Sequence, residues 1–227
     1  MKKDMSDLSL IIATYNEEES LNFVLDELSH FKFHEIIIVD NNSKDNTVNI
    51  AKNYDTKIIQ QEGPGWGSAV LEGLNFASGK YLTYMDGDGS YNPEGIVEMY
   101  NLINDFDFVC CSRYKNNNKS EDDTFVRALG NKLFTLITNQ FLNLKISDAL
   151  FFYPLFKKSD FEVTKPKSKN FGLCIEIPFL LSKKGLSYRD VLSLERKRYG
   201  GKTKVNAFKD GFTIGLEIVK MKFRNKL

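Results

Sequence analysis

The sequence of 227 residues has little of the chemistry that stabilises very small domains or binds zinc, since it contains 3 cysteines and 2 histidines. Cys110 and Cys111 are adjacent inside an apolar run and Cys174 stands alone, so neither a disulfide framework nor metal-ligand spacing is visible. His30 and His34 lie near the end of a predicted helix, where we expect surface or capping side chains. These counts argue against a disulfide scaffold and a zinc domain.

Long apolar runs are also absent. The longest candidate for a membrane span, ALFFYPLF at residues 149–156, is far shorter than the roughly 18 residues that a span needs. Acidic residues interrupt the N-terminal segment, and its apolar run is too brief for a signal peptide, so we expect a cytoplasmic protein. The 42% of hydrophobic and 27% of charged residues are typical of a globular chain, and the length fits one domain over residues 1–227.

The net charge of +1 conceals an asymmetry along the chain. From Lys183 to the end, 13 Lys and Arg stand against 4 Asp and Glu, a balance of +9, which leaves −8 for residues 1–182. A basic end on an acidic body indicates contact with an anionic partner: phosphates, a lipid surface or nucleic acid.

The first 115 residues alternate between strand-like and helix-like patterns. The strand-like runs are residues 8–15, 35–40, 56–61, 80–86 and 106–114. The helix-like runs between them are residues 16–31, 42–54, 63–78 and 92–105. Strands separated by helices favour right-handed crossovers and a mostly parallel sheet with helices on both faces. The predicted fold class is therefore α/β.

Polar clusters follow four of the predicted strands, at residues 14–17, 40–42, 63–65 and 86–88. Ligands of parallel α/β sheets bind beyond the carboxyl ends of the strands. We therefore expect these clusters to converge on one rim of the sheet.

The second half is less regular. A helical pattern over residues 125–146 is apolar around an unusually wide arc, and residues 170–185 read as a helix or a buried segment. Residues 194–206 form a basic, glycine-interrupted loop. The tail places apolar side chains on one helical stripe, namely Phe208, Phe212, Leu216, Val219 and Phe223. We divide the chain into a regular half (1–115), a less regular part (116–204) and a basic amphipathic tail (205–227).

Two carboxylates, Asp86 and Asp88, end the fourth predicted strand in the sequence YLTYMDGDGS. Carboxylates this close repel each other unless a cation lies beside them. Hard oxygen ligands around a flexible glycine suit Mg²⁺ or Mn²⁺ that is also bound by phosphate oxygens and water. The peptide fits a polar turn equally well.

Two nucleotide-binding motifs are absent. GPGWGSA lacks the third glycine of a dinucleotide fingerprint, and the Asp at about the expected distance, Asp86, belongs to the next strand. No GKS or GKT starts a helix, so there is no phosphate loop of that type.

The motifs LSLIIATYNEEESL, EIIIVDNNSKDNT and GPGWGSAVLEGLNFASGKYLTYMDGDGS resemble the nucleotide-sugar half of family 2 glycosyltransferases with the GT-A fold. The resemblance is closest to the polyprenyl-phosphate (dolichol-phosphate) mannosyl- and glucosyltransferases. It continues in SRY, RALGNKLFTLI, SDALFFY, NFGLCIEIPFLL and RYGGKTKVN, and so covers nearly the whole chain. It implies a GT-A, Rossmann-like sheet with C-terminal amphipathic helices. Residues 1–115 would then be the nucleotide-sugar-binding half and residues 116–204 the acceptor half.

The resemblance also implies roles for individual residues. Those that would bind the nucleotide sugar are Ala13, Tyr15, Glu17, Asp40, Asn41 and Asp86. Those that would hold the metal are Asp86, Asp88 and Ser90. The expected catalytic residues are Asp88, Arg113, Arg127 and Arg198. Those that would bind the acceptor phosphate are Arg127, Arg198, Lys202 and Lys204.

The sequence departs from the family pattern at three places. Asn41 and Asn42 replace the usual Asp-Gly, Trp66 stands where a lysine is common, and Pro154 stands where an arginine is usual. The first departure affects base recognition, and the last affects the choice of acceptor or sugar.

The implied reaction is a metal-dependent, inverting transfer of mannose or glucose from GDP-mannose or UDP-glucose to polyprenyl phosphate, with Mg²⁺ or Mn²⁺ as cofactor. An alternative keeps the donor site but uses a saccharide hydroxyl as acceptor, which requires a carboxylate base. Asp122, Asp123 and Glu176 are the candidates for that base. The alternatives for these residues are a solvated acidic loop and a structural ion pair.

A polyprenyl phosphate stays in the bilayer, so the resemblance implies peripheral association with the cytosolic face of a membrane, alone or through an integral membrane partner. The expected contact segments are residues 125–144 and the tail, whose phenylalanine stripe lies opposite Lys209, Lys220, Lys222 and Arg224. The alternative is that these helices close the core or meet a partner subunit. Nucleic acid is not an expected partner, because the tail's aromatic residues follow a helical stripe.

Overall fold

The computed structural model describes residues 3–115, 125–151, 153–203 and 207–224. The strands are β1 (Lys3–Thr14), β2 (Phe31–Asp40), β3 (Lys57–Gln60), β4 (Tyr81–Asp86), β5 (Phe108–Ser112), β6 (Pro154–Lys157) and β7 (Tyr188–Leu192). The helices are α1 (Leu21–Leu28), α2 (Thr47–Ala51), α3 (Trp66–Phe76), α4 (Glu94–Leu102), α5 (Phe125–Leu142), α6 (Lys158–Thr164), α7 (Leu173–Lys183) and α8 (Ala207–Arg224).

The seven strands form one sheet in the order β3-β2-β1-β4-β6-β5-β7. β6 is antiparallel to both of its neighbours, β4 and β5, while every other neighbouring pair is parallel. The carboxyl ends of the six other strands therefore lie along the same edge, which we call the rim. The predicted α/β class with a mostly parallel sheet is confirmed.

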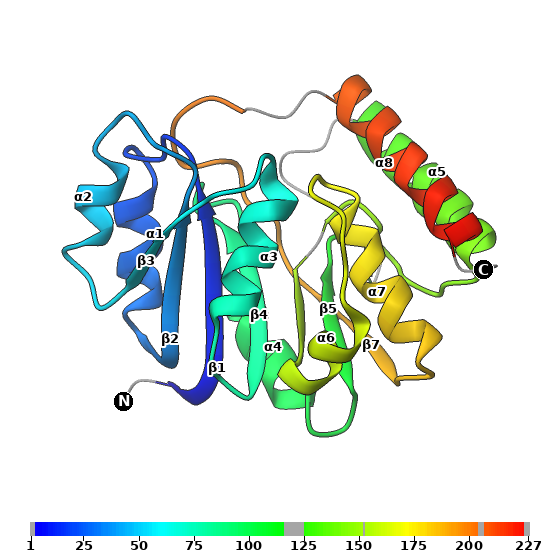
Figure 1. Ribbon diagram of the computed structural model, residues 1–227, viewed down its shortest axis with the longest axis horizontal. Helices are drawn as coiled ribbons and strands as arrows, with labels where there is room; N and C mark the ends of the chain where they lie inside the picture. The colour runs from blue at the N-terminus through cyan, green and yellow to red at the C-terminus, as the bar shows by residue number, and fades with distance from the viewer. Residues whose placement is uncertain (1–2, 116–124, 152, 204–206, 225–227) are drawn as a thin grey trace.

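Helices cover both faces of the sheet (Figure 1). Leu10 and Ile12 of β1 belong to a core cluster with residues of α1, α2 and α4. Ile11, which points to the other face, packs in a cluster with residues of α3, α6 and α7. A third cluster joins α5, α7 and α8. Figure 1 shows α8 alongside α5, at the end of the molecule away from β3.

β6, α6 and β7 were not predicted from the sequence. β6 has four residues and begins with Pro154, a residue that a sheet accepts mainly at a strand start or edge because it has no N–H to donate. Thr83 of β4 donates its hydroxyl to the Pro154 carbonyl at 2.6 Å, which helps to hold β6 between β4 and β5. This strand depends on partners that lie far away in the sequence.

The scarce residues of the chain lie as expected. All three cysteines are free and buried. His34 is exposed, and its ring contacts the Ser6 carbonyl at 3.3 Å and the Ser78 hydroxyl at 3.1 Å. Within the described part of the chain, no helix combines the length and the apolar character that crossing a membrane demands.

Candidate active site

The two aspartates lie in a tight turn at the rim. Asp86 is the last residue of β4 and is in register with Ala13 of β1. Gly89 adopts φ +82°, and a Cβ at this position would lie 2.9 Å from the Cβ of Tyr199. The glycine is therefore required by the positive φ of the turn and by the close approach of the segment that contains Tyr199.

Both oxygens of Asp88 have hydrogen-bond partners. Oδ1 accepts hydrogen bonds from the backbone N–H of Ser90 at 2.9 Å and from its hydroxyl at 2.6 Å. Oδ2 accepts a hydrogen bond from Nη1 of Arg198 at 2.9 Å. Ser90, predicted as a metal ligand, here orients the Asp88 carboxylate.

Asp86 has a different environment. Its Oδ1 accepts a hydrogen bond from the indole Nε1 of Trp66 at 2.7 Å. The pKa of Asp86 is raised to about 7, mainly by desolvation and secondly by the negative charge of Asp88. A partly buried carboxylate beside a second one is a site where a cation is stabilising.

Arg198 joins the two sides of the rim. It lies in residues 193–201, the segment that follows β7, which we call the rim segment. Its Nη2 donates to Oε2 of Glu17 while its Nη1 donates to Asp88, and its Nε donates to the Gly200 carbonyl at 2.6 Å. Burial alone would lower the pKa of Arg198, but the hydrogen bond and charge of Glu17 raise it. The guanidinium is therefore a fixed positive charge between two acids.

Aromatic and ionic contacts hold the rim segment on α1. The ring of Tyr199 stacks on Phe23 with centroids 4.1 Å apart, and the backbone N–H of Tyr199 donates to the Asp88 carbonyl at 2.9 Å. Arg196 makes two hydrogen bonds of 2.8 Å to the carboxylate of Glu27. Sequence reasoning missed these contacts; the basic run around Arg198 was the only signal for them.

The predicted nucleotide-binding residues lie at the ends of β1 and β2. Asp40 is buried and accepts hydrogen bonds from the hydroxyls of Thr14 at 3.2 Å and Ser43 at 2.5 Å. Tyr15 is 42% exposed, and the N–H of Asn41 donates to the Thr14 carbonyl at 2.9 Å. The rim therefore places these residues, with Ala13, on the same side as Asp86.

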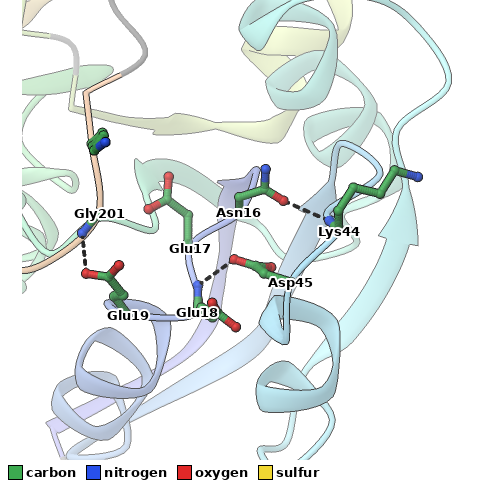
Figure 2. A pocket seen from close by; sticks show the side chains of 8 residues that line it. Asn16, Glu17, Glu18, Glu19, Lys44, Asp45 and Gly201 are labelled. Carbon is green, nitrogen blue, oxygen red and sulfur yellow. Dashed lines mark hydrogen bonds between the residues drawn. The ribbon is translucent and has the colours of Figure 1, made fainter.

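A pocket of about 440 Å³ opens beside Glu17. It is lined by Asn16, Glu17, Glu18, Glu19, Lys44, Asp45, Gly201 and Lys202 (Figure 2). Figure 2 shows three hydrogen bonds between its lining residues. The backbone N–H of Gly201 donates to Glu19 at 2.8 Å, that of Glu18 to Asp45 at 3.1 Å and that of Lys44 to Asn16 at 2.8 Å. Lys202, a predicted acceptor-phosphate residue, lies at its exposed edge.

Arg113 is enclosed by other side chains. It is 5% exposed, donates to both oxygens of Asp148 at 2.8 and 3.0 Å, and reaches Glu195 of the rim segment at 3.3 Å. Burial alone would lower the pKa of Arg113, but the hydrogen bonds and charge of Asp148 raise it. In this arrangement Arg113 links the end of β5 to the rim segment.

The structure does not give the positions of several other predicted side chains. Lys204, Asp122 and Asp123 lie outside the described residues, as does the side chain of Arg127 in α5. Glu176 is fully buried in α7 and accepts hydrogen bonds from the backbone N–H groups of Lys167 at 2.8 Å and Ser168 at 2.6 Å.

The rim suits a divalent cation that is shared with a substrate. Among the described residues, no group of three or more His, Cys, Asp and Glu side chains is arranged to hold a metal. Mg²⁺ is usually bound by one or two carboxylates together with water and phosphate oxygens. Asp86 and Asp88 provide that kind of ligand set.

Comparison with known proteins identifies the family. The model of glycosyl transferase family 2 matches residues 9–164, more than half of the chain. The chain is 27% identical to a dolichyl-phosphate hexose transferase of Haloferax volcanii, over 97% of this chain and 96% of that protein. It is 28% identical to a UDP-N-acetylglucosamine–dolichyl-phosphate N-acetylglucosaminyltransferase of Methanococcus voltae, over 80% and 82%.

A solved structure confirms the fold. Glucosyl-3-phosphoglycerate synthase from Mycobacterium tuberculosis, in complex with Mn²⁺, uridine diphosphate and phosphoglyceric acid, superposes with a TM-score of 0.72 at 17% identity. The match covers 95% of this chain and 78% of the synthase. Together with the family match, this GT-A-like sheet shows that the chain belongs to glycosyl transferase family 2 and is a glycosyltransferase.

Proposed function

We propose that this chain is a metal-dependent, inverting glycosyltransferase that moves a hexose, mannose or glucose, from a nucleotide sugar to polyprenyl phosphate. The observation that carries the proposal is the meeting of Glu17, Asp86, Asp88 and Arg198 at one rim of the sheet. Two relatives that are named for dolichyl phosphate support the acceptor. A neighbour with the same fold that binds Mn²⁺ and uridine diphosphate supports the donor and the metal.

Cleavage of a sugar–diphosphate bond leaves negative charge on the departing nucleoside diphosphate. A divalent cation bound at Asp86 and Asp88 would stabilise that charge as a Lewis acid. Asp88 is already oriented by Ser90, and Arg198 adds a positive charge that needs no reorganisation during the reaction. The chain therefore supplies both an anchor for the cation and a fixed countercharge.

A phosphate acceptor already carries a nucleophilic oxygen, so the reaction needs no strong base. Arg198 and Lys202 would hold the acceptor against repulsion from the donor. Attack from the face opposite the leaving group inverts the anomeric carbon. The hydroxyl-acceptor alternative needs a carboxylate base, and Glu176 is a poor candidate because it is buried and hydrogen-bonded to backbone N–H groups.

Helix α5 has an inverted burial pattern that supports a membrane location. Thr135 and Thr138 are buried, whereas the helix exposes large aliphatic side chains. The exposed fractions are 59% for Leu129, 56% for Leu133, 62% for Leu136 and 54% for Ile137. A helix that turns most of its leucines outward is expected to lie against an apolar environment.

Helix α8 continues this surface. Its exposed side chains are Phe212, Leu216, Val219 and Phe223, while Ile214, Ile218 and Met221 face the protein. We call the exposed apolar side chains of the two helices the α5–α8 face. Four members of the predicted stripe have described side chains: Phe212, Leu216, Val219 and Phe223. All four are exposed, so they are not part of the core.

The charge around the α5–α8 face favours an anionic bilayer as its occupant. The sequence of α5 contains no acidic residue, and its Lys132 is exposed. The sequence of α8 has four basic residues against Asp210 and Glu217, and Lys220 pairs with Glu217 at 2.7 Å. Apolar burial combined with attraction to anionic headgroups is how interfacial helices bind membranes. We therefore propose peripheral association with the cytosolic face of a membrane, where polyprenyl phosphate is available.

The test is a transfer assay with the purified chain. A panel of GDP- and UDP-sugars is incubated with Mg²⁺ or Mn²⁺ and with either a polyprenyl phosphate or a saccharide as acceptor, and the glycosylated products are identified by mass spectrometry. The proposal predicts one glycolipid whose formation stops when a chelator is added. Transfer to a saccharide hydroxyl, with none to the lipid, would support the alternative acceptor; no transfer from any donor would contradict both.

A further inference from the structure

The only tryptophan of the chain, Trp66, contacts one of the two rim aspartates. Trp66 is the first residue of α3, and its indole Nε1–H donates to Oδ1 of Asp86 at 2.7 Å. Among the residues that the structure describes, this indole is the one hydrogen-bond donor to the Asp86 carboxylate.

The indole ring is held on two sides. It stacks on Phe171, with ring centroids 5.2 Å apart and an angle of 23° between the planes. It also meets Tyr84 of β4 edge-on, with centroids 5.8 Å apart. Tyr84 is fully buried and Phe171 is partly buried. Because these two rings flank the indole, it has little freedom to turn its N–H away from Asp86.

The backbone around Trp66 is packed as closely as its ring. Gly65 has φ +85°, and a Cβ there would lie 2.5 Å from the Lys169 carbonyl. That carbonyl also accepts the N–H of Ser68 at 3.3 Å. The segment that contains Phe171 therefore lies directly on the first turn of α3, with no room for a side chain at Gly65.

A buried carboxylate fixes this supporting segment in turn. Glu176 accepts hydrogen bonds from two successive backbone N–H groups, those of Lys167 and Ser168. Glu176 is fully buried in α7. Its carboxylate therefore ties α7 to the segment that supports Trp66, which gives this acid a structural role.

We propose that Trp66 is a positioning residue for Asp86. Its N–H holds Oδ1 and so fixes the carboxylate in the orientation that leaves Oδ2 for the cation or the donor. The indole N–H is a neutral donor, so it orients the carboxylate and leaves its negative charge available to a cation. The inference rests on the proposed function, since it assumes that Asp86 binds a metal-nucleotide complex.

The test compares three variants by calorimetry, with Mn²⁺ plus UDP and Mn²⁺ plus GDP as probes. Trp66→Phe keeps an aromatic ring against Phe171 but removes the N–H, and we expect roughly tenfold weaker binding of the complex that the wild type binds. Trp66→Lys restores a donor and should bind within about threefold of the wild type. Phe171→Leu removes the stacking partner but keeps the indole and its edge-on contact with Tyr84, so it should bind within about twofold. Melting temperatures are measured in parallel.

Equal binding by Trp66→Phe and the wild type would overturn the inference and leave the proposed function intact. The inference would also be overturned if Phe171→Leu lost as much affinity as Trp66→Phe and Trp66→Lys bound no better than Trp66→Phe. Such a result would mean that Trp66 acts only through packing. If Trp66→Phe does not fold, the wild-type fluorescence decides: Mn²⁺ with the nucleotide that binds should quench Trp66, and unchanged emission during binding would overturn the inference. A wild type that binds neither complex would contradict the proposed function itself, and the inference with it.

Discussion

At the residue scale, the candidate site depends on charges that lie far apart in the sequence. Asp88 and Arg198 are 110 positions apart, and Arg198 also reaches Glu17, 181 positions away. The sequence could predict the two aspartates because they lie at a strand end and are separated by a single glycine. It could not predict that Arg198 would donate to Asp88 or that the indole of Trp66 would donate to Asp86, because only the folded sheet brings those partners together.

Asp88→Asn tests the residue on which the reaction depends most. The amide keeps the shape of the side chain but removes the negative charge that would bind the cation, so we expect transfer to fall by roughly 100-fold or more. The melting temperature should change little, because the rim segment keeps its contacts with α1. The control is Asp55→Asn, an exposed acid. Full activity of Asp88→Asn would count against the metal assignment.

Glu35 gives a pH dependence that is separate from the rim. It is buried in β2 and accepts hydrogen bonds from Ser9 at 2.7 Å, Ser78 at 2.6 Å and Lys57 at 2.7 Å. Burial alone would raise its pKa, but Lys57 and the serine hydrogen bonds lower it from 4.5 to about 2. Since the folded state binds the proton less tightly, this stabilisation is complete above about pH 5 and is lost as the pH falls toward 2.

Glu35→Gln should therefore cost about 1–3 kcal/mol of unfolding free energy at pH 7. The variant should also lose less stability than the wild type between pH 5 and pH 3. Urea denaturation at several pH values measures both effects. Parallel loss of stability in the two proteins over that range would show that Glu35 does not titrate as we expect.

At the element scale, α5 shows what periodicity can and cannot predict. The apolar pattern over residues 125–146 predicts a helix, and α5 is one. The pattern is apolar around a wide arc, so it does not say which side is buried. The fold buries Thr135, whose hydroxyl accepts the N–H of Ala149 at 3.0 Å, and leaves Leu133 and Leu136 exposed.

The α5–α8 face can be tested with single substitutions. Leu133→Ser and Phe212→Ser each remove a side chain from this face, and burial of such a side chain contributes about 1.5–3 kcal/mol. We therefore expect each variant to bind phosphatidylcholine vesicles that contain phosphatidylglycerol roughly tenfold more weakly than the wild type, measured by cosedimentation. Binding should also weaken as salt increases.

The matched control is Phe76→Ser, because Phe76 is 51% exposed but belongs to α3. It should bind vesicles as the wild type does. Equal loss in all three variants would mean that the effect is not specific to the face. A wild type that ignores vesicles would point to a protein, such as an integral membrane partner, as the occupant.

At the scale of the whole molecule, the charge asymmetry of the sequence has a structural counterpart. The basic C-terminal part contributes the rim segment, whose Arg198 lies between acids of the first half of the chain. The α/β class and the rim could be predicted, because strands alternate with helices and polar clusters follow the strands. The strand order could not, since β6 enters between β4 and β5 through long-range pairing.

The central claim is that the rim binds a divalent cation through Asp88, together with a nucleoside diphosphate. The most direct measurement is anomalous diffraction from crystals grown with Mn²⁺ and UDP or GDP. The account predicts a manganese peak within coordination distance of an Asp88 carboxylate oxygen, in contact with the diphosphate. A nucleotide bound at the rim with manganese located elsewhere, or with no manganese peak, would contradict it.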